Sequence, residues 1–218
     1  MRISSQKYRY LLFYKPYGVL SQFTNSNGEN QKRTLKDYIP IPDVYPVGRL
    51  DWDSEGLMLL TDCGQLQYRL SHPQFQHPRT YWAQVERVPD VDALKQLQQG
   101  VMIENYRTRP AKVRLLDFEL AADAPSHGAA LADTQLPPRD QPIRFRKNVP
   151  TAWLEITLTE GKNRQVRRMT AKVGFPTLRL VRTKIAHLSL EKLQPGQWRD
   201  LTFDELNLLL QLTRLKQP

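Results

Sequence analysis

The apolar residues of this chain follow the period of strands in some segments and the period of helices in others. Residues 80–88 and 153–159 alternate between apolar and polar side chains, as half-buried strands do. Between them, Val91, Leu94 and Leu97 recur at helical spacing. Because strands and helices mix without a regular strand–helix–strand order, the sequence predicts an α+β fold with a mixed, mostly antiparallel sheet.

Further elements complete this prediction, and the length of 218 residues suffices for one large domain or two small subdomains. A capping box formed by Thr202 and Glu205 precedes a C-terminal helix. Residues 22–36 predict a polar loop. Strands are expected at residues 8–14, 57–61, 112–118 and 181–190, and helices at residues 65–71 and from residue 163 to Gly174.

The domain organisation follows from composition along the chain. Residues 1–7 are polar and basic and predict a short tail, whereas residues 8–215 are expected to form a single domain. Residues 121–150 contain five prolines together with Ala, Asp and Gln. This composition predicts an insertion or mobile loop rather than a part of the core.

The charge of the chain points to a polyanionic partner. The sequence has 32 Lys and Arg against 22 Asp and Glu, a net charge of +10, which favours nucleic acid over an anionic membrane. No apolar run approaches the roughly 20 residues of a membrane span, and the N-terminus does not resemble a signal peptide. Cys63 is the only cysteine, so no internal disulfide is expected and a reducing cytoplasm is the predicted location.

The segment at residues 48–56 holds three acids and an arginine between two glycines. Arg49 lies beside Asp51 and is expected to keep its carboxylate ionised, which suits nucleophilic or base chemistry. A solvated acidic turn explains the same spacing. A calcium loop fits poorly, because its twelfth position is Asp62 rather than a bidentate Glu and a strand is predicted where a helix should follow.

Two further segments have both a structural and a functional interpretation. On the predicted helix after residue 163, Arg164, Arg168 and Lys172 lie opposite the apolar face and form either a row of phosphate contacts or a merely solvated face. Arg167 falls at the boundary of the two faces. Tyr81 points inward from its strand, either as a core residue or as a platform on which a base stacks.

These segments occur together and in order, and their combination resembles the pseudouridine synthases of the ribosomal small-subunit type. The resemblance spans residues 8–210 without 121–150, and it includes GRLD at residues 48–51 and KNRQVRRM at residues 162–169. It implies the family's mixed sheet in two subdomains, with an RNA-binding cleft between them. Most relatives carry a small N-terminal RNA-binding module, which is expected to be absent here. The remaining matches lie at residues 13–19, 46–57, 79–81, 160–161 and 195–201.

The resemblance also implies roles for individual residues. Asp51 is expected to be the catalytic carboxylate, which attacks either the uracil ring or the ribose anomeric carbon. Tyr81 is expected to stack on the uracil, Arg167 to pair with Asp51, and Arg49 to fill the space that the flipped base leaves. Leu188, or alternatively Ile185, should line the uracil pocket, whereas Asp53 and Glu55 should fix the loop. Further substrate contacts are expected from Lys15, Lys162, Asn163, Arg164 and Arg168.

The reaction that this resemblance implies is the isomerisation of a specific uridine to pseudouridine. A short, basic member without the extra module points to large-subunit (23S) ribosomal RNA as substrate. An isomerisation needs no cofactor or metal, and we expect a monomer that requires no protein partner. The alternative is a non-catalytic RNA-binding factor for ribosome assembly on the same scaffold, but such a binder has no use for an anion at its RNA site.

Overall fold

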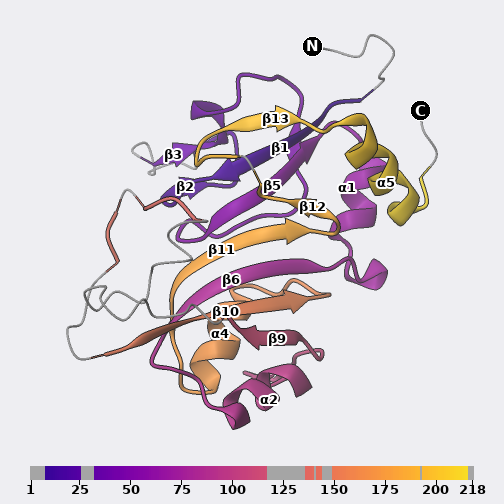
Figure 1. Ribbon diagram of the computed structural model, residues 1–218. Coiled ribbons are helices and arrows are strands. Elements are labelled where there is room, and N and C mark those ends of the chain that lie inside the picture. The colour runs from indigo at the N-terminus through magenta and orange to yellow at the C-terminus, as the bar shows by residue number, and fades with distance from the viewer. Residues whose placement is uncertain are drawn as a thin grey trace. The chain divides into compact units, whose positions relative to one another are not determined.

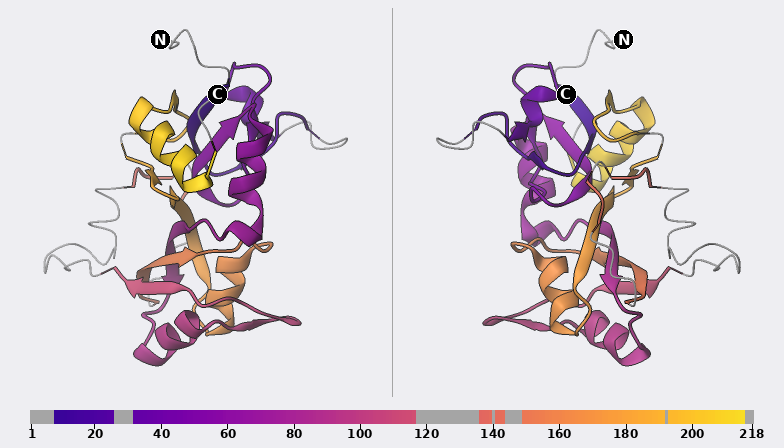
Figure 2. Two further views of the ribbon diagram at one scale, coloured as in Figure 1. Left: turned by 90° about the vertical axis from the view of Figure 1, so that its right-hand side faces the viewer. Right: turned by 90° about the vertical axis from the view of Figure 1, so that its left-hand side faces the viewer.

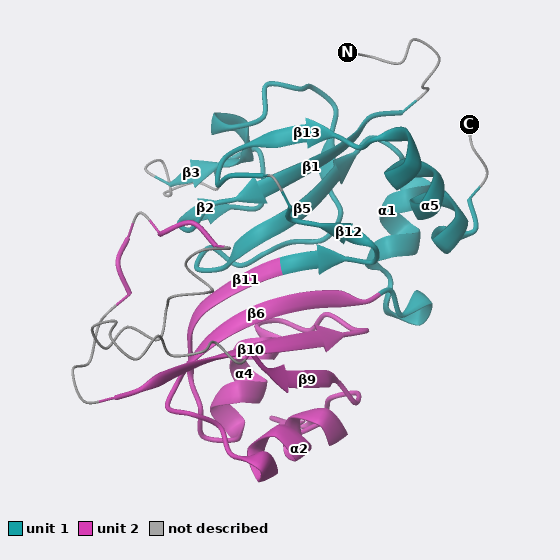
Figure 3. Ribbon diagram, in the orientation of Figure 1, with its two compact units in different colours: residues 1–77, 183–218 teal, residues 78–182 magenta. Residues whose placement is uncertain are grey.

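The chain forms two compact units, which are best described one at a time (Figure 3). Unit 1 comprises residues 1–77 and 183–218, and unit 2, residues 78–182, is inserted between these two parts. The computed structural model describes residues 8–25, 32–116, 136–139, 141–143, 149–191 and 193–215. The tail predicted at residues 1–7 and most of the predicted insertion at residues 121–150 lie outside these ranges.

Unit 1 contains an antiparallel sheet with β1 (Tyr10–Lys15) at its centre (Figure 1). This strand pairs with β5 (Glu55–Thr61) on one side and with β13 (Trp198–Asp200) on the other. The short strand β4 (Tyr45–Pro46) adds to β5. Every residue of β1 and β5 is buried, which explains why both segments are continuous apolar runs rather than alternating ones.

Two helices of unit 1, α1 (Gly64–Ser71) and α5 (Phe203–Thr213), contact each other (Figures 1 and 2). The predicted capping box of α5 is confirmed. Thr202 Oγ1 accepts a hydrogen bond from the Glu205 amide at 3.2 Å, and the Glu205 carboxylate accepts one from the Thr202 amide at 2.8 Å. Arg199 on β13 donates two hydrogen bonds of 2.6 Å to Glu205 and thereby lowers the pKa of this carboxyl to about 2. The same carboxylate therefore caps α5 and ties it to the sheet.

Unit 2 also has an antiparallel sheet, in which β10 (Thr151–Leu158) pairs with β6 (Arg79–Glu86) and β9 (Lys112–Leu115). The strand β11 (Thr177–Ile185) lies on the other side of β6, and its last residues belong to unit 1. The predicted alternation is confirmed, because the inward residues of β6 and β10 form the core. Its members are Ala83, Val85, Leu154, Ile156 and Leu158, with Leu97, Val166 and Met169 from the helices.

The helices α2 (Val91–Gln99) and α4 (Gln165–Lys172) supply those last three core residues and so cover one face of this sheet (Figure 2). The shorter elements connect the longer ones. In unit 1 they are the parallel pair β2 (Val19–Leu20) and β3 (Arg33–Thr34), the 3₁₀ turns η1 (Leu35–Asp37) and η2 (Pro73–Phe75), and β12 (Leu188–Ser189), which pairs with β11. In unit 2 they are β7 (Met102–Ile103) and β8 (Tyr106–Arg107), which form a hairpin.

The observed elements agree with the α+β prediction but differ from it at several boundaries. The loop predicted at residues 22–36 contains β3 and η1, because Thr34 pairs with β2 and Leu35 is buried, contacts too short to produce a periodic pattern. The strand predicted at residues 112–118 ends at Leu115. Helix α4 begins at Gln165 because Arg164 has a φ of 50°, which no helix residue adopts. No helix among the described residues is long and apolar enough to cross a membrane.

Gly100 ends α2 in a conformation that requires glycine. Its φ is 84°, and a Cβ at this position would lie 2.2 Å from the carbonyl oxygen of Thr108. We expect Gly100→Ala to lower the free energy of unfolding of unit 2 by about 2 kcal/mol or more, measured by urea denaturation. Gly64→Ala is the control, because a Cβ at residue 64 would meet no atom within 4 Å beyond its own helix and chain neighbours. A loss of stability in the control as large as that of Gly100→Ala would contradict this explanation.

Candidate active site

The loop that carries Asp51 is fixed through its backbone on both sides. Before it, the Ser21 hydroxyl donates a hydrogen bond to the Leu50 carbonyl at 2.7 Å and accepts one from the Leu50 amide at 3.1 Å. After it, the carbonyl of Trp52 accepts a hydrogen bond from the Gly18 amide at 2.9 Å. The side chain of Asp51 is half-buried. The fold therefore holds this carboxylate at a defined position while leaving part of it exposed.

Lys15 supports the turn that holds this loop. Its side chain is buried, and its ammonium donates hydrogen bonds to the carbonyls of Pro16 at 2.9 Å and Val19 at 2.7 Å. Within the same turn, the Tyr17 ring packs against Trp52, with 5.2 Å between ring centroids. Lys15 thus positions Gly18 and, through it, the Asp51 loop, whereas its expected contact with RNA stays a prediction.

The remaining residues of the segment differ in exposure. Arg49 is exposed next to Asp51, Asp53 is half-buried, and Glu55 is buried at the start of β5. An EF-hand loop that starts at Asp51 would run to Asp62, but residues 55–61 form the buried strand β5 and cannot wrap around an ion, so the calcium hypothesis fails. In the described part of the chain, no three His, Cys, Asp or Glu side chains gather closely enough to hold a metal ion.

In unit 2, Tyr81 lies on β6 opposite Ile156 and is half-buried against the core. Arg79 precedes it by two residues and so projects from the same face of the strand. Burial lowers the pKa of the Arg79 guanidinium and the nearby charge of Arg182 lowers it further, whereas Tyr81 raises it. Arg79 therefore places a cation on the strand face that carries Tyr81, which suits an anionic substrate.

Helix α4 presents its basic side chains much as predicted, with one exception. Val166, Met169 and Thr170 are buried, which confirms the core face, and the half-buried Arg167 donates a hydrogen bond to the Thr177 carbonyl at 3.2 Å. Arg164 and Lys172 are exposed. The exception is geometric, because the left-handed conformation of Arg164 places it outside the helix and breaks the row of three cations.

Arg168 and Asn163 form a contact that sequence reasoning did not identify. Arg168 donates a hydrogen bond to the Asn163 side-chain oxygen at 3.0 Å and forms an ion pair of 3.3 Å with Glu104. Glu104 lies at the turn of the β7–β8 hairpin and has a φ of 53°. Part of the positive charge of α4 is therefore balanced by this hairpin.

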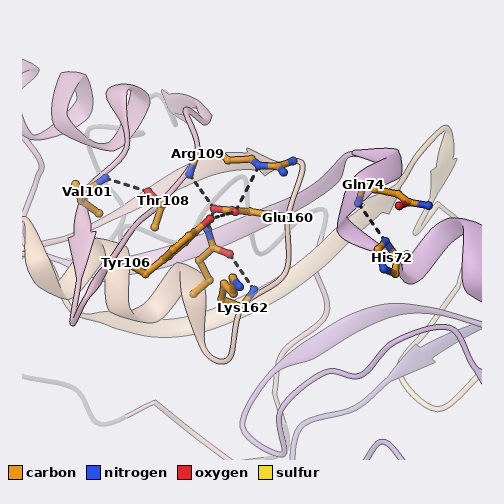
Figure 4. Close-up of polar contacts among 9 residues, drawn as sticks. His72, Gln74, Val101, Tyr106, Thr108, Arg109, Glu160 and Lys162 are labelled. Atoms are coloured by element: carbon orange, nitrogen blue, oxygen red, sulfur yellow. Dashed lines mark hydrogen bonds and ion pairs between the residues drawn. The ribbon is translucent and has the colours of Figure 1, made fainter.

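Glu160 is a second residue that sequence reasoning missed, although it belongs to a matched string. Its carboxylate is buried and accepts hydrogen bonds from the Tyr106 hydroxyl, the Arg109 amide at 2.9 Å and the Gln165 side chain at 2.6 Å (Figure 4). The bond to Glu160 raises the pKa of the Tyr106 hydroxyl. The Arg109 guanidinium lies 3.9 Å away. Glu160 therefore joins the β7–β8 hairpin to the start of α4.

This network also places the basic residue Lys162. The oxygen of the Gln165 side chain accepts a hydrogen bond from the Lys162 amide at 3.0 Å, and the Lys162 ammonium lies 4.9 Å from the centre of the Tyr106 ring (Figure 4). A cation over an aromatic face is attracted by the ring quadrupole. The exposed segment at residues 161–164 is thus held in place by contacts with Gln165 and Tyr106, which are both hydrogen-bonded to the buried Glu160 carboxylate.

Leu188, the expected pocket residue, lies in β12 directly opposite its alternative Ile185 on β11, and both are buried. The expected site residues divide between the units. Unit 1 holds Asp51, Arg49, Lys15 and Leu188, whereas unit 2 holds Tyr81, Arg167 and the basic segment.

Comparison with known proteins identifies the class of protein that this fold and these segments define. Residues 9–172 match the family model of RNA pseudouridylate synthase, so the chain belongs to this family and is an isomerase. The predicted family and fold are therefore confirmed.

Individual relatives also support the assignment of the chain to this family. The chain is 48% identical over 92% of its length to ribosomal large subunit pseudouridine synthase E of Vibrio parahaemolyticus, covering 76% of that protein. It is 54% identical over 87% of its length to the protein of the same name from Xanthomonas campestris, covering 93% of it. A crystal structure of a pseudouridylate synthase matches 94% of this chain and 74% of that chain, with a TM-score of 0.71 and 26% identity.

The buried position of Glu160 leads to a stability prediction. We expect Glu160→Ala to lower the free energy of unfolding of the protein by about 3 kcal/mol, because it leaves the buried Gln165 side-chain amide and the partly buried Tyr106 hydroxyl and Arg109 amide without their acceptor. Glu160→Gln keeps an acceptor oxygen and should cost about 1 kcal/mol. Urea denaturation measures both values.

The control is Glu155→Gln on β10, whose carboxylate pairs with the exposed Arg114 at 2.8 Å. This surface pair should contribute less than about 1 kcal/mol. Equal decreases in the free energy of unfolding for Glu155→Gln and Glu160→Ala would show that Glu160 contributes no more to stability than a surface acid.

Proposed function

We propose that this chain isomerises a specific uridine of large-subunit ribosomal RNA to pseudouridine, with Asp51 as the nucleophile. The observation that carries the proposal is the Asp51 loop, whose backbone is hydrogen-bonded before and after a half-exposed carboxylate. The two relatives described above bear the name of a large-subunit enzyme, which supports the choice of RNA. The net charge of +10 suits a polyanionic substrate.

The reaction breaks the bond between ribose C1′ and uracil N1 and forms one between C1′ and C5. The proton on C5 is lost and N1 gains one, so atoms balance without a co-reactant. The target base must first leave its stack. In this proposal Asp51 attacks the uracil ring or C1′, and Arg49 occupies the space that the base leaves. Tyr81 stacks on the uracil, and Arg167 pairs with the Asp51 carboxylate.

The second candidate is a non-catalytic RNA-binding factor, which the basic surface of α4 would serve equally well. A half-exposed carboxylate at an RNA site repels phosphates, so a pure binder gains nothing from fixing it. The rigid support of the Asp51 loop favours the enzyme, because catalysis requires reacting groups to be held in a defined geometry.

We extend the proposal to a monomer that acts in the cytoplasm without a protein partner. Cys63 is buried and free, which suits a reducing compartment. A monomer leaves the basic surface of each copy accessible to RNA.

Replacement of Asp51 tests the nucleophile. We expect native protein to release tritium from ribosomal RNA labelled at C5 of uridine, and Asp51→Asn to release essentially none while still binding the RNA, because an amide is no nucleophile. Asp53→Asn is the matched control, two residues away, and should retain most of the activity. Tritium release by Asp51→Asn at the native rate would exclude Asp51 as the nucleophile.

The basic surface of α4 leads to a prediction about salt dependence. Arg164→Ala combined with Arg168→Ala should weaken RNA binding and reduce the slope of log K against log salt by about 0.7–0.9 for each phosphate that the protein no longer neutralises. Glu104→Gln should strengthen binding, because it frees Arg168 from its ion pair. Fluorescence anisotropy over a salt series measures both effects.

The control is Lys95→Ala, which removes an exposed cation of α2 in the same unit. An equal change of slope in this control, or an unchanged slope in the double variant, would mean that the α4 cations are only solvated.

A further inference from the structure

Four aromatic rings form a continuous surface group in unit 1, which we call the aromatic ladder (Tyr68, His72, Phe75 and His77). The distance between ring centroids is 5.2 Å from Tyr68 to His72, 5.6 Å from Tyr68 to Phe75 and 6.4 Å from Phe75 to His77. The ladder follows the C-terminal end of β5, whereas Asp51 precedes its N-terminal end. Tyr68 lies on α1 and Phe75 on η2, so the ladder is built from elements other than the Asp51 loop.

The ladder does not serve the core of unit 1. Helix α1 buries Leu66 and Leu70, and Tyr68 lies between them in sequence and therefore projects from the opposite face. The Tyr68 side chain is 52% exposed, and His72 is exposed as well. Phe75 and His77 are half-buried, but packing inside the protein does not explain the exposed rings of Tyr68 and His72.

Hydrogen bonds nevertheless hold the exposed rings in place. The Gln74 side-chain amide donates to the Tyr68 hydroxyl at 3.2 Å. The Gln74 backbone amide donates to His72 Nδ1 at 3.4 Å (Figure 4). Because Nδ1 accepts, the neutral His72 ring carries its hydrogen on Nε2 and presents a donor. Rings ordered in advance lose little conformational entropy when a ligand stacks on them.

The charge around the ladder suits a polyanion. The Arg69 guanidinium carbon lies 4.8 Å from the centre of the Phe75 ring. The segment of unit 1 that carries the ladder, residues 63–77, contains Arg69 but no Asp or Glu. Exposed rings beside a cation, with no acid in the same stretch, have the chemistry that binds unpaired nucleotides.

We propose that the aromatic ladder binds unpaired nucleotides of the RNA at a distance from the target uridine. A base stacks on the exposed Tyr68 ring, Arg69, which lies over the Phe75 ring, contacts a phosphate, and His72 Nε2 donates to a base or a phosphate oxygen. The inference rests on the proposed function only in taking this RNA to be the substrate. The exposed rings and their cation are also suited to RNA that is not isomerised.

A direct binding experiment uses the full chain and a fluorescein-labelled oligoadenylate of about ten nucleotides. We expect Tyr68→Ala to bind it roughly tenfold more weakly, because one base no longer stacks. Tyr68→Trp should bind as tightly as native protein, whereas Tyr68→Leu should be as weak as Tyr68→Ala. Phe203→Ala, which removes a 60% exposed ring from α5 of the same unit, should change nothing.

The outcomes separate this inference from the proposed function. The inference that the ladder binds RNA is supported if Tyr68→Ala raises the KM for ribosomal RNA in the tritium-release assay and leaves kcat unchanged. It is also supported if native protein releases no tritium but its oligonucleotide binding depends on Tyr68, although the proposed function would then be wrong.

Three results would overturn the inference. The first is native affinity for the oligonucleotide in Tyr68→Ala. The second is restored affinity in Tyr68→Leu, which would indicate a merely apolar contact. The third is a concentration-dependent mass in light scattering that Tyr68→Ala abolishes, which would assign the ladder to contact between two copies of the chain.

Discussion

The double hydrogen bond between the Ser21 hydroxyl and the Leu50 peptide is the contact on which the geometry of the Asp51 loop depends. Both polar groups of Leu50 bond to one side chain, at 2.7 and 3.1 Å, and Leu50 itself is buried. A loop without such partners samples many conformations, and fixing each residue costs about 1–2 kcal/mol. Because the folded protein already orders this loop in the absence of substrate, the binding energy of the RNA is not needed to order it and can orient the substrate instead.

The basic segment before α4 shows a second constraint, the balance of charge. The neighbouring cations of this segment repel one another, and the buried Glu160 and the exposed Glu104 offset this repulsion. The two acids act differently. Glu160 is inaccessible and fixes the backbone around Gln165 and Lys162, whereas Glu104 holds Arg168 in a surface pair that phosphate can replace. The hairpin β7–β8 therefore shapes the surface that is expected to meet RNA.

Prediction from the sequence succeeded where apolar residues keep the same spacing over a long segment, as in β6, β10 and α5. It also identified the core face of α4 and placed Arg167 at the boundary of that face. It failed where a contact joins distant positions, because nothing near Ser21 in the sequence reveals that it bonds to a residue 29 positions away. Glu160 was missed for a related reason, since an acid at the end of a strand usually lies in solvent. The left-handed Arg164 shows that helical spacing fails as soon as one residue leaves the helix.

Strand β5 lies between the two segments of unit 1 that are proposed to contact RNA. All seven of its residues are buried and its neighbours β1 and β4 are hydrogen-bonded to it, so it cannot shorten or bend freely. Asp51 precedes the N-terminal end of β5, and the helix and turn that carry the aromatic ladder follow its C-terminal end. In the proposed binding mode, a substrate presents its target uridine to Asp51 and an unpaired base to the ladder, so the two contacts together select RNAs by shape. Selectivity of this kind arises from geometry and does not require that any base be read at its edge.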